Sequence, residues 1–508
     1  MRRRWRRPCA RPSLASSFVC VMTVYAAWML MRNHQIIIKR TTLPLLSSSV
    51  SLPCPSSVRN PPSLEPGILP LPEWMTQYAR QQRQHLQNYP SLCSQRITMM
   101  IPSQKTTNSH HHDRGQLRWI CQNPQECGGL GDRLYGIVMA LYIAMMTNRT
   151  FHIVLPGSGL VLNGSNMLSS KSPTVSFLEP ALIDWSIPSS SSPLYDSQLT
   201  SNNKNNNNQP LPLLRVRDDR RHPLLLEPCT HAGLFMTSTS QYSSNSIVHL
   251  QVNILTHEPI LRNSSCFQQY CRPWKGCLDN DDDDDTSQQQ QHTAHHRSLF
   301  HIGFWALFQW PPHVNEHMRQ LKASAGMDNE TIRPYIAMHV RTGQAETWED
   351  PLRHAGDDNL RLFHTCARRL QHHLQQHCGG DQATIPVYIA SDNNYAKVRI
   401  PQLNSEDHAQ EKEASFYANT DMEILHMSKS RQNEMENVGQ AVRHVWSELR
   451  ILMDATCIVM SHSKFSYMGA ELSPQQPRCA VLFDECDETT VATAVQAVSL
   501  PCVVERHE

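Results

Sequence analysis

The sequence has 508 residues, a formal net charge of +1 at pH 7 and 18% charged residues. This length is enough for two or more domains with additional segments. A chain that is nearly neutral as a whole gives no electrostatic reason to bind nucleic acid, and we expect no nucleic-acid partner.

The N-terminus is basic, and an uncharged segment follows it. Arginines crowd residues 1–13, whereas residues 14–31 carry no charge. That length lies at the lower limit for crossing a bilayer, and no small-residue cleavage site follows it. Basic flanks stay on the cytoplasmic side. We therefore expect a cytoplasmic tail (1–13), a single-pass type II transmembrane signal anchor (14–31) and a luminal remainder. A cleaved signal peptide and a buried core helix are the alternatives.

Low-complexity segments separate the ordered parts of the chain. Residues 32–90 are rich in Ser, Pro and Gln, which is typical of a stem. The region from about 158 to 298 carries Ser, Asn, Asp and Gln tracts that bury too little apolar surface to fold, so we interpret it as irregular insertions. The Asp run at 281–285 is interpreted as a solvated acidic loop, because nothing nearby fixes a metal geometry. We expect no metal site.

The 16 cysteines suit an oxidising compartment, with reduced buried thiols as the alternative. Three groups of cysteines lie close enough in sequence to form short-range disulfides, although spacing does not settle the pairing. They are Cys121 with Cys127; Cys266, Cys271 and Cys277; and Cys479, Cys486 and Cys502.

Four N-x-S/T sequons occur, at Asn148, Asn163, Asn263 and Asn329. Asn148 ends an apolar helical run, and we interpret it as too buried for glycosylation. Asn163 and Asn263 lie in polar loops and are better candidates.

Two series of apolar strands alternate with helical patterns along the chain. The first has a lead-in at 118–121, a helix over 134–147 and a strand over 151–155. The second has strands over 335–340, 387–390, 457–460 and 480–483, with helices over 360–373 and 438–454 and one that begins at 465. Such alternation predicts α/β architecture with parallel sheets. We predict two Rossmann-like domains (91–330 and 331–508) that face a cleft, with function at the carboxyl ends of the strands.

A Gly-rich turn, G-G-L-G-D-R at 128–133, opens the first long helix. Glycines let a backbone approach a ligand closely, and a helix N-terminus favours an anion. A dinucleotide fingerprint requires Gly or Ala where Leu134 stands and a strand directly before the glycines, which disfavours NAD. The alternative is a tight turn that leads into a core helix.

Two further motifs follow predicted strands. H-V-R-T-G (339–343) places Arg341 beside Gly343 at a strand end, where a guanidinium fork is suited to a phosphate. An ion pair with a carboxylate is the alternative. After the strand 457–460, the polar turn S-H-S-K-F-S (461–466) leads into a helix and is typical of either a helix cap or a phosphate or base-edge contact.

Together with V-Y-I-A-S-D (387–392), these motifs resemble the fucosyltransferase superfamily of α1,2-, α1,6- and protein O-fucosyltransferases, over roughly residues 117–485. The resemblance implies a GT-B fold and inverting transfer from GDP-fucose to a glycan or glycoprotein. It also implies no cofactor or essential metal, and a Golgi or ER membrane location. Thr342 stands where the α1,2 and α1,6 branches often carry a second arginine. A GT-B transferase with another nucleotide sugar, or an inactive luminal binding protein, are the alternatives.

The resemblance also assigns roles to residues of the C-terminal, nucleotide-sugar-binding domain (331–508) and of the Gly-rich turn (128–133). Arg341 would hold the donor diphosphate, and Asp454 would accept from the guanine ring. The other expected contacts with donor or acceptor are His339, Gly343, Asp392, Ser463, Phe465, Ser466, Gly129, Gly131 and Arg133.

Acceptor activation requires a base, and Asp132 is our candidate because it leaves the Gly-rich turn. The carboxylates that compete with it are Glu346, Glu349 and Asp350. Asp132 could instead cap its helix or pair with Arg133.

Overall fold

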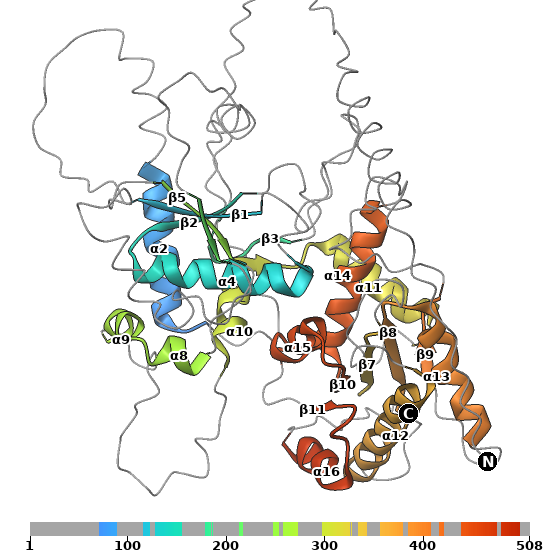
Figure 1. The fold of residues 1–508 in the computed structure, drawn as a ribbon. Helices are drawn as coiled ribbons and strands as arrows, with labels where there is room; N and C mark the ends of the chain where they lie inside the picture. Colours follow the sequence, from blue (N-terminus) through green and yellow to red (C-terminus); the bar gives the residue numbers. More distant parts are fainter. Residues whose placement is uncertain are drawn as a thin grey trace, which may run out of the picture. The chain divides into compact units, whose positions relative to one another are not determined.

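The computed structural model describes residues 71–88, 115–121, 128–154, 178–183, 185, 213–216, 247–252, 258–272, 297–325, 327, 334–342, 356–378, 385–407, 416–420, 438–474 and 479–497. The chain is an α/β protein in which helices and short strands alternate (Figure 1).

The N-terminal half is built on a four-stranded parallel sheet with the order β2-β1-β5-β4. Its strands are β1 (Gln116–Ile120), β2 (Thr150–Val154), β4 (Leu213–Val216) and β5 (Ile247–Val252). Helix α4 (Leu130–Met146) connects β1 to β2 and is buried on nearly all sides, which explains its unbroken apolar sequence. Helix α10 (Leu299–Leu307) belongs to the same hydrophobic core.

Helix α2 (Glu73–Asn88) lies in the segment that the sequence assigned to a stem, and it was not predicted. Trp74 and Met75 are buried in the first core. The Tyr78 hydroxyl donates to the carbonyl of Arg149, 2.9 Å away, just before β2. Helix α2 therefore packs with the first sheet.

The remaining elements of this half are β3 (Glu179–Pro180), antiparallel to β6 (Phe308–Gln309), and the helices α8 (Glu258–Arg262) and α9 (Ser265–Cys271).

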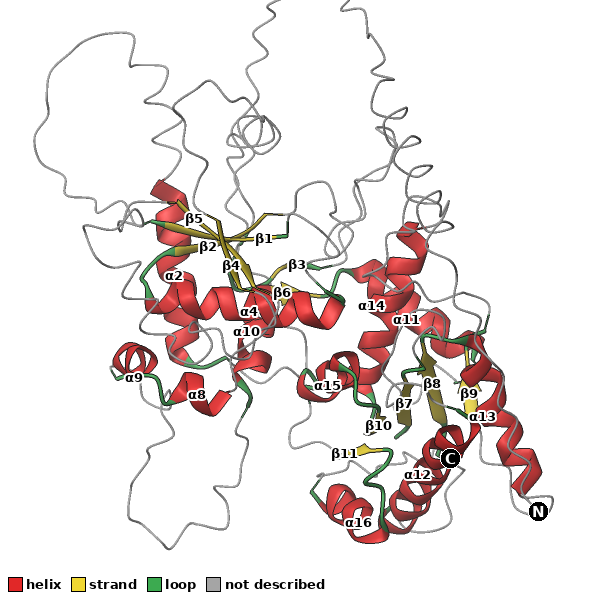
Figure 2. Ribbon diagram, in the orientation of Figure 1, coloured by secondary structure: helices red, strands yellow, loops and turns green. Residues whose placement is uncertain are grey.

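The C-terminal half contains a five-stranded parallel sheet with the order β11-β10-β7-β8-β9 (Figure 2). Its strands are β7 (Ile336–Val340), β8 (Val387–Ser391), β9 (Phe416–Ala418), β10 (Cys457–Met460) and β11 (Cys479–Leu482). Its helices are α11 (Pro312–Ser324), α12 (Asp357–His377), α13 (Asn394–Asp407), α14 (Val438–Asp454), α15 (Lys464–Glu471) and α16 (Glu488–Gln496). The chain runs from β7 outward through β8 to β9, then returns past β7 to β10 and β11. The order is that of half of a doubly wound fold.

The structure confirms the second series of predicted strands to within one or two residues, and the helix predicted over 438–454 coincides with α14. The prediction that residues 158–298 are irregular is wrong in part. It supplies β4 and β5, two of the four strands of the first sheet, although the sequence had been interpreted there as irregular.

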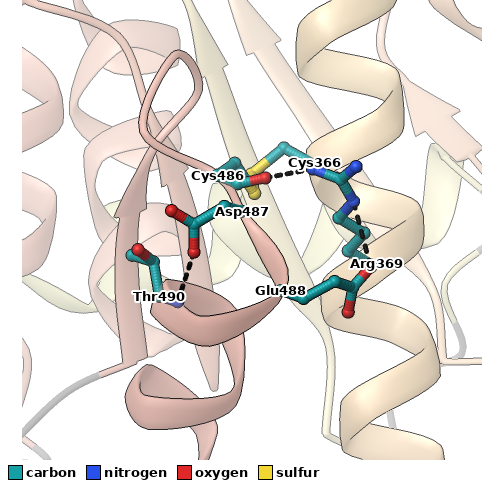
Figure 3. The surroundings of a disulfide bond; sticks show 6 residues. All are labelled: Cys366, Arg369, Cys486, Asp487, Glu488 and Thr490. Carbon is teal, nitrogen blue, oxygen red and sulfur yellow. Dashed lines mark hydrogen bonds and ion pairs between the residues drawn. A yellow bond between two sulfur atoms is a disulfide. The ribbon is translucent and has the colours of Figure 1, made fainter.

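Two disulfides correct the expectation that the cysteines of the C-terminal trio pair with one another. Cys457 bonds to Cys479, its direct neighbour on the adjacent strand. Cys366 bonds to Cys486 across a separation of 120 residues and ties α12 to the segment after β11 (Figure 3). Arg369 reinforces this link, since it donates to the Cys486 carbonyl and pairs with Glu488 at 3.2 Å.

The sequon residue Asn148 is exposed, which corrects the expectation that it is buried. It follows α4 with φ of 53°, a left-handed conformation that Asn tolerates better than most residues and that ends the helix.

No helix of the described ranges is both long and apolar enough to span a bilayer. The predicted anchor (14–31) lies outside these ranges.

Candidate functional site

Arg341 and Thr342 follow β7 directly, and Asp392 follows β8, so the parallel register brings them to the same edge of the sheet. Arg341 Nη1 lies 2.7 Å from Asp392 Oδ2, and both side chains are mostly buried. The other carboxylate oxygen, Oδ1, accepts from the backbone N–H and the hydroxyl of Thr342 at 2.9 and 3.0 Å. Asp392 thus fixes the path of the chain as it leaves β7, and the predicted ion-pair alternative for Arg341 is present in the structure.

A buried polar cluster lies beside this pair, where β7 and β10 end. The Nδ1 atom of His339 is 2.6 Å from the Ser466 hydroxyl and 3.1 Å from the Ser461 hydroxyl. The Phe465 ring lies 5.1 Å from the imidazole. Burial lowers the pKa of His339 to about 4, with Asp392 acting in the opposite direction, so the ring is uncharged at neutral pH. Ser463 caps α15 by accepting from the N–H of Phe465.

This cluster lies where two connections of the second sheet diverge. β7 and β10 are neighbours, but the connection after β7 leads towards β8 and the connection after β10 leads towards β11. The two connections therefore diverge at the carboxyl ends of these strands. In open parallel sheets this divergence is where ligands bind. The N-terminus of α15 starts at the same edge and adds a partial positive charge.

The Gly-rich turn opens α4 at the carboxyl end of β1. Gly128 has φ of 74°, a conformation that favours glycine. At Gly131, a Cβ would lie 2.8 Å from Cβ of Lys464, so glycine is required for the close approach of α4 to α15. The sequence had assigned this glycine to a ligand approach. The structure shows it packed against the start of α15.

The charged residues of the turn have partners within the protein. Asp132 Oδ2 accepts from the N–H of Gly129 at 2.9 Å, and Oδ1 lies 2.5 Å from Nζ of Lys464. The first contact caps the helix, and the second joins the starts of α4 and α15. Arg133 is buried and donates through Nε to the carbonyl of Gly128. Burial lowers its pKa to about 10, which still leaves the guanidinium charged.

Asp454 is the residue that the structure separates from the others. It ends α14 and precedes β10, at the amino-terminal edge of the sheet, whereas Arg341 lies at the carboxyl edge. Its carboxylate pairs with Arg450 at 3.2 Å. Gly343 and the alternative bases Glu346, Glu349 and Asp350 lie outside the described residues.

The motifs 339–343 and 461–466 contain Thr342, Ser461 and Lys464, but sequence reasoning gave none of the three an individual role in the site. Ser461 is the first residue after β10, so its position at a strand end was a usable signal. Lys464 contacts Asp132 across 332 residues of sequence, a relation that no local pattern carries. Within the described ranges, no three His, Cys, Asp or Glu side chains form a cluster that could hold a metal ion.

No family model matches the sequence, and no curated protein matches it. Among solved structures, the chain is similar to the α-1,6-fucosyltransferase NodZ co-crystallised with GDP and to NodZ soaked with GDP-fucose. In both comparisons the TM-score is 0.35 and the sequence identity 14%, over 71% of this chain and 94% of the other. At this level of similarity, the function has to be argued from the residues of the chain itself.

Proposed function

We propose that the protein transfers fucose from GDP-fucose to a glycan or glycoprotein acceptor in the secretory pathway, with inversion and without a metal. The observation that carries the proposal is Arg341 at the carboxyl end of β7, next to the point where the connections of β7 and β10 diverge. A nucleotide diphosphate is the ligand chemistry that suits a guanidinium at this place.

Arg341 pairs with the carboxylate of Asp392. A diphosphate carries more negative charge than a carboxylate and offers oxygens in the spacing that a guanidinium binds with two hydrogen bonds. The interaction strengthens as charge develops on the departing nucleotide, which is how a binding contact lowers the barrier to transfer. The neutral imidazole of His339 and the hydroxyls of Ser461 and Ser466 supply a polar wall without a competing charge.

Deprotonation of the acceptor hydroxyl requires a base, and Asp132 remains our proposal among the described carboxylates. Asp132 accepts from the N–H of Gly129 and pairs with Lys464. The contact with Lys464 has to open before the carboxylate can reach an acceptor hydroxyl. An Asp132→Asn variant that folds normally but loses most of its kcat supports this role, whereas unchanged turnover assigns Asp132 to helix capping alone.

The proposal is tested with the full-length protein in detergent, given a panel of GDP- and UDP-sugars with and without EDTA. We expect binding of GDP, transfer from GDP-fucose to a glycan array, and the same turnover in EDTA. Transfer from another nucleotide sugar, or activity that EDTA abolishes and manganese restores, would point to a different transferase. Binding of GDP without any transfer supports an inactive binding protein, and the absence of nucleotide binding overturns the proposed site.

A further inference from the structure

Two of the N-x-S/T sequons fall on described residues, and the fold exposes the asparagine of each. Asn148 lies in the turn between α4 and β2, and Asn263 lies in the turn between α8 and α9. Both residues are exposed. An oligosaccharide is bulky and polar, so a folded protein can carry one only where the asparagine faces solvent. Both positions meet this requirement.

The turn that carries Asn148 is fixed on both sides. Before it, the hydroxyl of the buried Thr147 donates to the carbonyl of Ile143 at 2.7 Å. After it, the carbonyl of Arg149 accepts from the hydroxyl of Tyr78 on α2 at 2.9 Å. Asn148 itself has φ of 53°, which reverses the chain between the helix and the strand. The fold therefore holds Asn148 at the exposed tip of a tight turn.

The third residue of this sequon, Thr150, carries a hydroxyl that the fold does not use. Thr150 begins β2 and is buried, and its N–H donates to the carbonyl of Gly115 at 3.1 Å. Among the described residues, its Oγ1 atom has no hydrogen-bond partner. A buried hydroxyl without a partner destabilises a protein, and valine would fill the same place without that cost. The sequon, however, requires a hydroxyl at this position. Glycosylation of Asn148 thus accounts for a threonine that packing alone does not explain.

The second sequon lies near the same end of α4. The sulfur atoms of Cys266 on α9 and Met146 at the end of α4 are 3.3 Å apart. Asn148 follows Met146 by two residues, and Asn263 precedes Cys266 by three. Such short stretches of chain keep both asparagines near this contact. The exposed turns therefore share one region of the surface, at the C-terminal end of α4.

Helix α4 separates this region from the Gly-rich turn. The helix has 17 residues, so its two ends are about 25 Å apart at a rise of about 1.5 Å per residue. Its N-terminal end is the one that packs against the start of α15, through Gly131 and Lys464. Oligosaccharides at the C-terminal end would therefore extend into solvent without blocking the proposed donor site.

We propose that Asn148 and Asn263 carry N-linked oligosaccharides, which together cover the surface at the C-terminal end of α4. The inference rests on the secretory-pathway location in the proposed function. Each side-chain amide nitrogen forms a bond to the anomeric carbon of an oligosaccharide carried on a lipid diphosphate. The bond from that carbon to the diphosphate breaks, the lipid diphosphate leaves with the electron pair, and the amide gives one proton to the transferring enzyme. At Asn148 this transfer precedes the formation of β2, because the Thr150 hydroxyl is buried afterwards.

The first test expresses the full-length protein in cells with a secretory pathway, with a C-terminal tag that contains its own N-A-T sequon. Asn148→Gly, which suits the left-handed turn, and Asn263→Gln should each migrate one oligosaccharide faster than the wild type on a gel, and the double variant two. A glycosidase that leaves aspartate at each released site should bring all forms to the same mobility. Mass spectrometry should then detect aspartate at positions 148 and 263.

A matched pair of variants separates the sequon from the shape of the side chain. Thr150→Ser keeps the hydroxyl and should retain the oligosaccharide at Asn148, whereas Thr150→Val keeps the shape and should lose it. In the Asn148→Gly background neither form is modified at this turn. There, adding Thr150→Val should raise the thermal unfolding midpoint, because an unpartnered buried hydroxyl is removed. A lower midpoint counts against the proposal, since it gives the hydroxyl a structural role.

The sequon of the tag distinguishes two kinds of failure. If the tag is glycosylated but positions 148 and 263 are not, the inference is wrong while the luminal location stands. If only one of the two is modified, the proposal fails for the other. If the tag is also unmodified, the chain does not enter the lumen, and the secretory-pathway location in the proposed function fails together with the inference.

Discussion

Arg341 is the single residue on which the proposed donor site depends most. A guanidinium that contacts phosphate in a partly dry site contributes about 1.5–3 kcal/mol, so Arg341→Ala should lower kcat/KM by about tenfold to a hundredfold. Arg341→Lys keeps the charge but loses the planar fork, and it should remain poor. Steady-state kinetics with GDP-fucose measure both effects.

Arg262 provides a matched control, because its side chain is also 17% exposed and also pairs with a carboxylate at 2.7 Å, that of Glu258. Arg262→Ala removes a comparable ion pair away from the sheet edge and should leave kcat/KM nearly unchanged. If Arg341→Ala folds and transfers fucose at the wild-type rate, the phosphate assignment is wrong. If it fails to fold while Arg262→Ala folds, the pair with Asp392 is a structural requirement.

The sequence located the site residues that follow strands, because the carboxyl ends of parallel strands share one edge of a sheet. Arg341, which follows β7, and Asp392, which follows β8, meet for that reason, and His339 lies near the end of β7. Asp454 does not join them, since it precedes its strand and so lies at the opposite edge. The packing of Gly131 against Lys464 was beyond sequence reasoning, because it depends on how two distant helices approach each other.

At the scale of elements, a buried ion pair joins α13 to α14. Lys397 Nζ lies 3.0 Å from Glu448 Oε1 and 2.9 Å from the carbonyl of Asn419, which follows β9. His444 contacts the same Glu448 oxygen at 3.2 Å. Burial alone would raise the pKa of Glu448, but Lys397 and His444 outweigh it and lower the pKa to about 2. The carboxylate is therefore ionised and paired within the protein interior.

Removal of one partner should be costly, because it leaves the other charge buried without compensation. Lys397→Met is expected to lower the free energy of unfolding by about 3–5 kcal/mol, and Lys397→Met with Glu448→Leu should recover most of that loss. Glu448 stabilises the wild type above about pH 4.5, and this contribution is lost as the pH falls through about 2. Urea unfolding as a function of pH measures both effects. Equal stability of the single and double variants would show that the charges are not coupled.

The elements themselves were only partly predictable from the sequence. The strands of the second sheet are runs of apolar residues followed by polar turns, and this pattern located each of β7, β8, β10 and β11. β5 alternates apolar and polar residues and lies among Ser- and Asn-rich segments, so its local composition hid it. Its place between β1 and β4 comes from pairing with distant strands. Helix α2 was missed for the same reason, since its apolar face is explained only by its packing in the first core.

At the scale of the whole molecule, the cysteine pairing bears on the compartment. Within the described residues, the disulfides Cys366–Cys486 and Cys457–Cys479 join segments of the second half, and the first of them closes a separation of 120 residues. Such bonds persist in oxidising compartments such as the ER lumen and are rare in the cytosol. The orientation expected from the basic N-terminus, in which the residues after the anchor face the lumen, stays a prediction.

The resulting prediction is that residues 14–31 remain in the mature protein as an anchor and that the part after them is luminal. In intact microsomes, added protease should spare the epitope of a C-terminal tag, and it should remove that epitope once detergent opens the vesicles. Alkaline carbonate should leave the protein in the membrane pellet, because a spanning helix holds it there, whereas a protein with a cleaved signal peptide is released. Digestion of the C-terminal part in sealed vesicles would reverse the orientation and place the described disulfides in a reducing compartment, against the expectation for such bonds.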